Sequence, residues 1–171
     1  AFMAEAWGKL DGRPGIAFVT RGPGATNASI GVHTAKQNSS PMILFVGQVG
    51  RAMRDREAFQ EVSYRDFFGT VAKWAVEIDD PDRIPEIVSR AFHVAMSGRP
   101  GPVVIGLPED MLTERTGRAP GRRISPTEAG ADPVSVERVG ALLAGAERPM
   151  IFVGGGGWSD EGRAELKRFA E

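Results

Sequence analysis

The stretch IAFVTRGPGATNASIGVHTAKQNSSPMILFVGQ, residues 16–48, decides the fold of this chain. It contains two short apolar runs, at residues 16–20 and 42–48, which lack the alternation of a half-exposed strand. Runs of this kind are typical of strands that are buried on both faces. Residues 25–40 between them have the length of a helix. The segment therefore predicts a strand–helix–strand unit, and its short connections make the two strands parallel.

The same alternation of strands and helices continues on both sides of this unit. The further elements that we expect are a helix over 1–11 that ends at Asp11-Gly12, a charged loop with one or two helical turns over 49–70, a strand over 73–78, a helix that starts at Asp79-Asp80-Pro81 and runs to Gly98, and a strand over 102–108. Carboxylate caps and a proline at the first helical position favour helix starts, whereas glycine favours helix ends. The sequence thus predicts an α/β fold with a doubly wound parallel sheet.

A Gly-, Pro- and Arg-rich segment over 113–132 predicts a linker, because it is long and holds one large aliphatic residue. After it we expect a helix, a strand over 150–153, a glycine run at 154–157 and a helix opened by Ser159 or Asp160. The predicted organisation is a first domain over 1–112, a linker over 113–132 and the beginning of a second, Rossmann-like α/β domain over 133–171. Because the chain starts with Ala inside a helical pattern, we expect it to be a fragment.

Composition excludes several function classes. The 171 residues carry a formal net charge of −1, which argues against a nucleic-acid-binding protein because such proteins present a basic face. The absence of cysteine excludes disulfides and thiolate metal sites. No apolar run approaches the roughly 18 residues that suggest a membrane span, and no signal-peptide pattern is present. We therefore expect a cytoplasmic protein without a nucleic-acid or membrane partner.

Ligands of open parallel sheets bind beyond the carboxyl ends of the strands. Here the first such edge carries RGPGATN, residues 21–27, whose glycines permit a close approach of the backbone. Neither a Walker motif nor a GxGxxG pattern is present there, so the stretch is not a standard phosphate-binding loop. On its own, it is compatible with a plain sharp turn or with a ligand contact.

Five segments occur in the order of one family: GPGATN, SSPMILFVGQV, EAFQE, AKW and SGRPGPVVIGLPEDM. They resemble the N-terminal, pyrimidine-binding domain of thiamine-diphosphate-dependent enzymes of the acetolactate synthase type. The resemblance covers residues 1 to about 112, and the linker and tail are similar to the start of the central domain of that family. It implies that thiamine diphosphate is the cofactor, with Mg²⁺ held by a domain absent from this chain.

The resemblance also implies where the proton chemistry lies. In the family, a glutamate bonds to the aminopyrimidine ring, and the cofactor then serves as an electron sink for a 2-oxo acid. That glutamate lies a few residues before the position of Ala1. We therefore expect no catalytic residue and no metal ligand in this chain, and we do not transfer the role to Glu5.

Recognition residues are carried over position by position. The resemblance implies that Gly22, Pro23 and Gly24 form the wall beside the pyrimidine, with Asn27 bracing this loop and Gln48 at the same sheet edge. Plain structural roles remain open for each of them, a satisfied polar strand end in the case of Gln48. The family residues near the reacting centre and the substrate channel match Phe59, Gln60 and Lys73.

Two arginines bear on cofactor and substrate. Arg99 occupies the position whose arginine contacts FAD in flavin-containing members of the family, although relatives without flavin share the motif. The glycine run at 154–157 suits either a tight turn or a nucleotide contact. Arg21 departs from the family, where many members have a small residue before GPG. Its guanidinium suits carboxylates, so we expect it to alter the substrate preference.

The resulting expectation is a fragment of an enzyme that acts on 2-oxo acids, by carboligation after decarboxylation, and that forms a homodimer or homotetramer. The alternatives are a 2-oxo acid or oxalyl-CoA-type decarboxylase on the same scaffold, a non-catalytic nucleotide- or flavin-binding α/β module, and an interaction protein that kept the fold without the chemistry.

Overall fold

The computed structural model describes residues 1–125, 129–156 and 158–171. Its contacts divide the chain into two units, residues 1–127 and residues 128–171. Residues 126–128 of the expected linker, 113–132, lie outside the described residues, and so does Gly157 of the glycine run at 154–157. Each unit is considered by itself.

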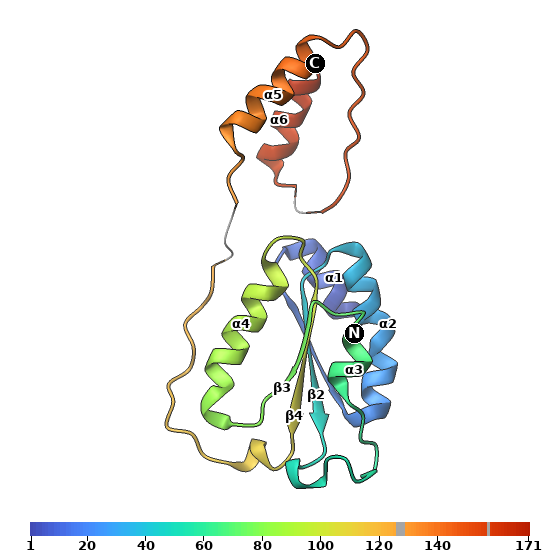
Figure 1. Ribbon diagram of the computed structural model, residues 1–171, viewed down its shortest axis with the longest axis vertical. Helices are drawn as coiled ribbons and strands as arrows, with labels where there is room; N and C mark the ends of the chain where they lie inside the picture. Colours follow the sequence, from blue (N-terminus) through green and yellow to red (C-terminus); the bar gives the residue numbers. More distant parts are fainter. Residues whose placement is uncertain (126–128, 157) are drawn as a thin grey trace. The chain divides into compact units, whose positions relative to one another are not determined.

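The first unit is built on a four-stranded parallel sheet, as predicted (Figure 1). The strands are β1 (Gly15–Thr20), β2 (Met42–Gln48), β3 (Trp74–Glu77) and β4 (Pro102–Pro108), in the order β1-β2-β4-β3. In the register, Thr20 lies opposite Gly47, and Gln48 lies opposite Pro108. The carboxyl ends of β1, β2 and β4 therefore meet at one edge of the sheet.

Helices lie on both faces of the sheet, so the predicted doubly wound arrangement is confirmed (Figure 1). The prediction that residues 16–20 are buried on both faces is wrong, because Ile16 and Phe18 of the edge strand β1 are exposed. One face packs against α1 (Phe2–Asp11), α2 (Arg21–Asn38) and α3 (Tyr64–Phe68), and the other packs against α4 (Ile84–Met96). The largest fully buried side chains are Tyr64, Phe68, Met42, Ile43, Leu44, Ile78, Ile105 and Met111. Short 3-10 helices lie at η1 (Arg51–Met53), η2 (Pro81–Arg83) and η3 (Met111–Thr113).

Helix α2 begins four residues earlier than the sequence pattern indicates. It starts at Arg21, directly after β1, so Gly22-Pro23-Gly24 form its first turn and are not a loop ahead of it. A proline is tolerated there because the first N–H groups of a helix have no partner within the helix. Small residues further along, such as Ala25, Ala28 and Ala35, are buried and let the helix approach the sheet closely.

Helix α1 buries its small residues, whereas its large apolar side chains remain exposed. It ends at Gly12, as predicted, with φ of 72°. Ala4, Glu5 and Gly8 are buried, and a Cβ on Gly8 would lie 2.0 Å from the carbonyl oxygen of Pro41. The exposed large apolar side chains of this helix are Phe2, Met3, Trp7 and Leu10.

The second unit contains α5 (Pro133–Ala144) and α6 (Asp160–Ala170). Asp132 caps α5, and Ser159 caps α6 by accepting a bond from the N–H of Gly162 at 3.0 Å. The predicted strand over 150–153 is wrong, because these residues are exposed and adopt no strand. A strand needs a neighbour for its backbone hydrogen bonds, and the described part of this unit supplies two helices and no second strand.

Candidate active site

A cavity of about 420 Å³ lies at the carboxyl edge of the sheet. It is lined by Thr20, Arg21, Gly47, Gln48, Gln60, Leu107, Glu109 and Leu112. These residues come from the ends of β1, β2 and β4 and from the segments that follow them. The cavity therefore occupies the position at which open parallel sheets bind their ligands, and its volume is in the range of small-molecule sites.

The glycines of the first turn of α2 are required by contacts within the chain. A Cβ on Gly22 would lie 2.8 Å from Val62 Cγ2, and one on Gly24 would lie 2.9 Å from Val19 Cβ. The N–H of Gly22 also donates to the carbonyl oxygen of Gln60 at 2.9 Å. The turn thus fixes the segment around residue 60 against β1. A direct contact of this turn with the cofactor remains a prediction.

Thr26 braces this turn. Its hydroxyl donates to the carbonyl oxygens of Gly22 and Pro23, both at 3.0 Å. Asn27, for which we expected the bracing role, is exposed and makes no side-chain hydrogen bond within the described part of the chain. Helical geometry explains the difference: a threonine side chain at this position reaches back to carbonyls three and four residues earlier, whereas the next residue points elsewhere.

Gln48 is buried and fully bonded. Its amide nitrogen donates to the carbonyl oxygen of Val62 at 2.9 Å and to Glu77 Oε1 at 3.2 Å, and its amide oxygen accepts the N–H of Val49 at 3.0 Å. The side chain therefore ties the ends of β2 and β3 to the segment that lines the cavity. This geometry agrees with the structural alternative, in which Gln48 is a polar residue at a strand end whose side-chain hydrogen bonds are made within the chain.

Tyr64 holds one of the residues that line the cavity. It is fully buried, and its hydroxyl donates to the carbonyl oxygen of Gly47, a cavity-lining residue, at 2.8 Å. Burial, with a smaller contribution from the negative charge of Glu77, raises the pKa of Tyr64 to about 12. The hydroxyl therefore stays protonated and acts as a fixed donor at neutral pH.

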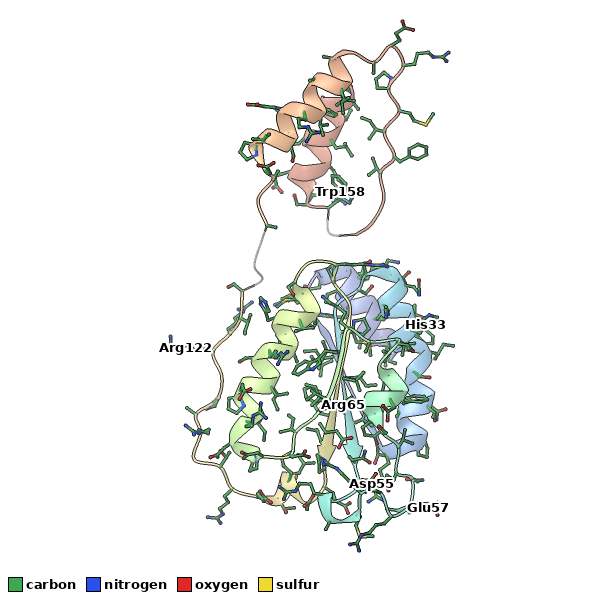
Figure 2. The ribbon with its side chains drawn as sticks, in the orientation of Figure 1. His33, Asp55, Glu57, Arg65, Arg122 and Trp158 are labelled. Atoms are coloured by element: carbon green, nitrogen blue, oxygen red, sulfur yellow. The ribbon has the colours of Figure 1, made fainter. Side chains whose placement is uncertain are left out.

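Residues 55–60 form a backbone of unusual conformation beside the cavity. Asp55, Glu57 and Gln60 have φ values of 59°, 52° and 65°, in the left-handed region that few residues other than glycine adopt. Glu61 holds the segment by accepting the N–H groups of Asp55 at 2.8 Å and Ala58 at 3.2 Å. Figure 2 shows Asp55 and Glu57 at the end of the sheet to which the strands point.

The predicted substrate-channel residues of this segment differ in their surroundings. Gln60 lines the cavity, whereas the side chain of Phe59 is 76% exposed. The carbonyl oxygen of Phe59 accepts a bond from Arg21 Nη1 at 3.3 Å. The structure thus brings the backbone of Phe59 to the site and leaves its ring in solvent.

Sequence reasoning singled out Arg21 but missed the ion pairs that surround the cavity. Arg21 Nη2 pairs with Glu109 Oε2 at 2.7 Å, and Arg51 Nε pairs with Asp110 Oδ2 at 2.8 Å. The side-chain hydrogen bond from Arg51 holds the pKa of Asp110 below its usual range. The signal in the sequence was LPED at 107–110, directly after a buried strand. Its carboxylates meet arginines that lie more than 50 residues away in the sequence, which no local pattern indicates.

A second charged cluster, centred on Arg54, lies next to Gln48. It pairs with Glu77 Oε2 at 2.7 Å and with Asp79. The side-chain hydrogen bond to Asp79 raises the pKa of Arg54 further above its already high value. Because Glu77 also accepts from Gln48, this cluster fixes the strand end that positions Gln48.

Two predicted residues lie at the opposite, amino edge of the sheet. Lys73 precedes β3, and its Nζ donates to the carbonyl oxygen of Ser97 at 2.7 Å; burial lowers the pKa of Lys73. Arg99 donates to Ser39 Oγ at 2.8 Å and to two carbonyls at the end of α2. A seven-residue strand spans about 20 Å, so neither is brought to the cavity within this unit. Their proposed contacts with substrate and FAD remain predictions.

Glu5 also lies at the amino edge, near the start of β2. Its Oε1 accepts hydrogen bonds from Asn38 Nδ2 and Ser40 Oγ, both at 2.9 Å. It is therefore well separated from the cavity. Among the residues that the structure describes, no cluster of three or more metal-ligating side chains occurs. No described helix is long and apolar enough to cross a membrane.

Comparison with known proteins gives a consistent result. Residues 1–68 match the family described as thiamine pyrophosphate enzyme, N-terminal TPP binding domain. The chain is 36% identical over 181 residues to an acetolactate synthase of Arthrospira platensis, covering 100% of this chain and 31% of the relative. It is 34% identical to the acetolactate synthase large subunit of Corynebacterium glutamicum, covering 98% of this chain and 28% of the relative.

The solved structures include a benzoylformate decarboxylase from Polynucleobacter necessarius that superimposes with a TM-score of 0.80 at 27% identity. The superposition covers 86% of this chain and 28% of that protein. The chain thus spans less than a third of the length of these relatives. The matched residues include α1, β1, the first turn of α2, β2 and the cavity-lining segment through Gln60. The chain belongs to the thiamine-pyrophosphate-dependent enzyme family.

Proposed function

We propose that this chain supplies the aminopyrimidine-binding wall of an enzyme that decarboxylates a 2-oxo acid and joins the remaining fragment to a second carbonyl compound. The observation that carries the proposal is the cavity at the carboxyl edge of β1, β2 and β4, five of whose eight lining residues lie in the segment matched by the family. Several relatives named acetolactate synthase support the carboligation.

The residues present fit a flat, polar heterocycle. Leu107 and Leu112 supply apolar contact, and Gln60 supplies an amide that can donate and accept hydrogen bonds. The cavity of about 420 Å³ has one cationic lining residue, Arg21, and the described residues contain no cluster of three or more metal-ligating side chains. The diphosphate and its Mg²⁺ are therefore proposed to be held by a part of the enzyme outside this chain.

Each residue has a distinct proposed task. The first turn of α2, at Gly22 and Gly24, shapes the wall, and Gln48 holds the strand ends in register around it. Gln60 faces the heterocycle, and the leucines exclude water from it. When bound, thiamine diphosphate supplies an electron sink for the bond next to the substrate carbonyl. No described residue is assigned the proton transfer, which the family resemblance gives to a glutamate before Ala1.

The remaining parts of the proposal concern FAD and assembly. Arg99 is the candidate contact for FAD, although its guanidinium caps α2 within this chain. Flavin absorbance of the purified full-length gene product tests this assignment. The exposed apolar side chains of α1, such as Phe2 and Trp7, are compatible with a homodimer or homotetramer. Light scattering of the same preparation measures that state.

Product analysis tests the proposed reaction. The full-length gene product is incubated with pyruvate, thiamine diphosphate and Mg²⁺, and released CO₂ is compared with the carbon products. Carboligation predicts one CO₂ for every two pyruvate molecules consumed, with the two-carbon remainder of the donor joined to the carbonyl carbon of the acceptor by a new C–C bond. The second candidate, a simple decarboxylase, is favoured by the similarity to benzoylformate decarboxylase and predicts an aldehyde alone. Absence of both products with pyruvate and with an aromatic 2-oxo acid would contradict the proposal.

A further inference from the structure

Arg21 is the one cationic side chain among the described residues that line the cavity. It follows β1 directly, and its backbone has φ of 46°. A residue other than glycine, asparagine or aspartate costs about 1 kcal/mol or more in this left-handed region. The backbone conformation at this position is therefore unfavourable for an arginine, which makes the interactions of its side chain significant.

The guanidinium is oriented at the cavity without being committed to a strong partner. Nη2 pairs with Glu109, but the side chain of Glu109 is 60% exposed, and ion pairs of this kind contribute little in water. The bond of Nη1 to the carbonyl oxygen of Phe59 is long, at 3.3 Å. A guanidinium has five N–H donors, and these two contacts leave others available for an incoming carboxylate.

Reaction chemistry decides which carboxylate Arg21 can usefully bind. Loss of CO₂ breaks the bond to the carboxylate of the donor and removes its negative charge from the substrate. A cation held on that carboxylate would stabilise the ground state more than the transition state and would slow the step. A cation on a carboxylate that stays in the product carries no such penalty.

We propose that Arg21 selects substrates that bear a carboxylate which is retained through the reaction. Before the substrate binds, Glu109 holds the guanidinium in place, and the substrate carboxylate then replaces Glu109 as its partner. The retained group is the carboxylate of an acceptor 2-oxo acid or the distal carboxylate of a dicarboxylic donor. Both have the same chemistry, and the planar fork of arginine binds it through two parallel hydrogen bonds. This inference rests on the proposed function of the cavity.

Substrate pairs that differ in one carboxylate test the inference on the full-length gene product. With pyruvate as donor, the acceptors pyruvate and acetaldehyde are compared; as donors, 2-oxoglutarate and 2-oxopentanoate are compared. The Arg21→Asn variant removes the guanidinium while asparagine tolerates the left-handed backbone. We expect kcat/KM to fall about 10- to 100-fold for the carboxylate-bearing member of one pair. The pair that responds identifies which carboxylate is bound.

Two further variants separate recognition from a structural clamp. Glu109→Gln removes the competing anion, so KM for the same substrate is expected to fall. If Arg21 and Glu109 serve only to join α2 to the end of β4, both variants will lose activity equally with every substrate. Arg21→Lys keeps the charge but loses the fork, and an intermediate kcat/KM is expected. Arg83→Gln, on an exposed arginine paired with Glu86, is the matched control.

The outcomes distinguish this inference from the proposed function. A wild-type protein without thiamine diphosphate binding would overturn the proposed function. A wild-type protein that is active, and in which Arg21→Asn changes both members of each pair by the same factor, would overturn this inference alone. If Arg21→Asn does not fold, the Glu109→Gln variant still decides, because recognition predicts a lower KM and a clamp predicts a loss.

Discussion

Glu5 is a buried carboxylate whose surroundings give it a structural task. It accepts two hydrogen bonds, from Asn38 and Ser40, and thereby joins α1 to the end of α2 and the start of β2. It lies at the amino edge of the sheet, whereas the cavity lies at the carboxyl edge. A role in cofactor activation is therefore incompatible with its position in this unit.

The Glu5→Gln variant tests this assignment. Both donors bind the same oxygen, Oε1, so an amide in place of the carboxylate can keep both bonds but loses the negative charge that strengthens them. We therefore expect the free energy of unfolding to fall by about 1–2 kcal/mol. Thiamine diphosphate affinity should be unchanged. Denaturant unfolding and cofactor titration measure the two quantities, with Glu86→Gln on exposed helix surface as the control. A lost cofactor affinity at unchanged stability would contradict the structural role.

Tyr64 gives a pH-dependent prediction. Its pKa is raised to about 12, above the value of 10.0 for a free tyrosine. The unfolded state therefore loses its proton first, so the contribution of this group to stability is complete below about pH 10 and is lost as pH rises toward 12. Tyr64→Phe should remove this pH dependence while it costs about 1 kcal/mol for the lost bond to Gly47.

Tyrosinate absorbance measures this titration directly, because Tyr64 is the only tyrosine in the 171 residues. In the full-length gene product, the difference between wild type and Tyr64→Phe isolates its signal. An apparent pKa near that of free tyrosine would contradict the buried donor at Gly47.

Individual residues were predictable from sequence to a limited extent. Gly22, Gln48 and Gln60 lie together at the expected edge because parallel strands bring their carboxyl ends to the same side. Arg99 and Lys73 lie at the other edge, since one follows α4 and the other precedes β3. Arg21–Glu109 could not be predicted, because residues 88 positions apart are joined only by the order of the strands in the sheet.

At the scale of elements, the segment between β2 and α3 determines the shape of the site. Its backbone places three non-glycine residues, Asp55, Glu57 and Gln60, in the left-handed region. Strain of this kind persists only where the surrounding bonds hold it. Here Glu61 supplies such bonds to two N–H groups, and Gly22 supplies another to the carbonyl oxygen of Gln60.

Replacement of Glu61 should therefore loosen this segment. In Glu61→Gln, the charged acceptor of the N–H groups of Asp55 and Ala58 is lost, and we expect their hydrogen exchange to accelerate about tenfold or more. The matched control is Glu57→Gln, four residues earlier in the same segment (Figure 2). Exchange measured by mass spectrometry on peptides that cover this segment provides the readout. Equal exchange in the two variants would contradict the holding role of Glu61.

Periodicity predicted the elements of the first unit well and one element of the second unit poorly. The runs at 42–48 and 102–108 are apolar because helices cover these strands on both faces, so pattern and environment agree. The run at 16–20 is equally apolar, but β1 is the edge strand of the described sheet and leaves Ile16 and Phe18 exposed. The run at 150–153 has the same composition, but the described residues around it supply no strand to pair with. Local sequence shows that a segment can form a strand, whereas pairing depends on the rest of the fold.

At the scale of the whole molecule, the chain covers less than a third of its relatives, and its cavity is one wall of the proposed cofactor site. The large side chains of α1, among them Phe2 and Leu10, remain exposed although they form an apolar stripe. The stripe indicates a helix correctly. It does not indicate which face of the helix is buried here, because Ala4 and Gly8 make the close contacts.

The cavity at the carboxyl edge is proposed to receive the aminopyrimidine of thiamine diphosphate. Calorimetric titration of the full-length gene product with thiamine diphosphate and Mg²⁺ tests this proposal most directly, with Gly22→Val, Gln60→Ala and the remote control Arg83→Gln. We expect binding by wild type and by Arg83→Gln, and a Kd weakened at least about tenfold in Gly22→Val and in Gln60→Ala. Binding that is equal in all four proteins, or absent from the wild type, would contradict it.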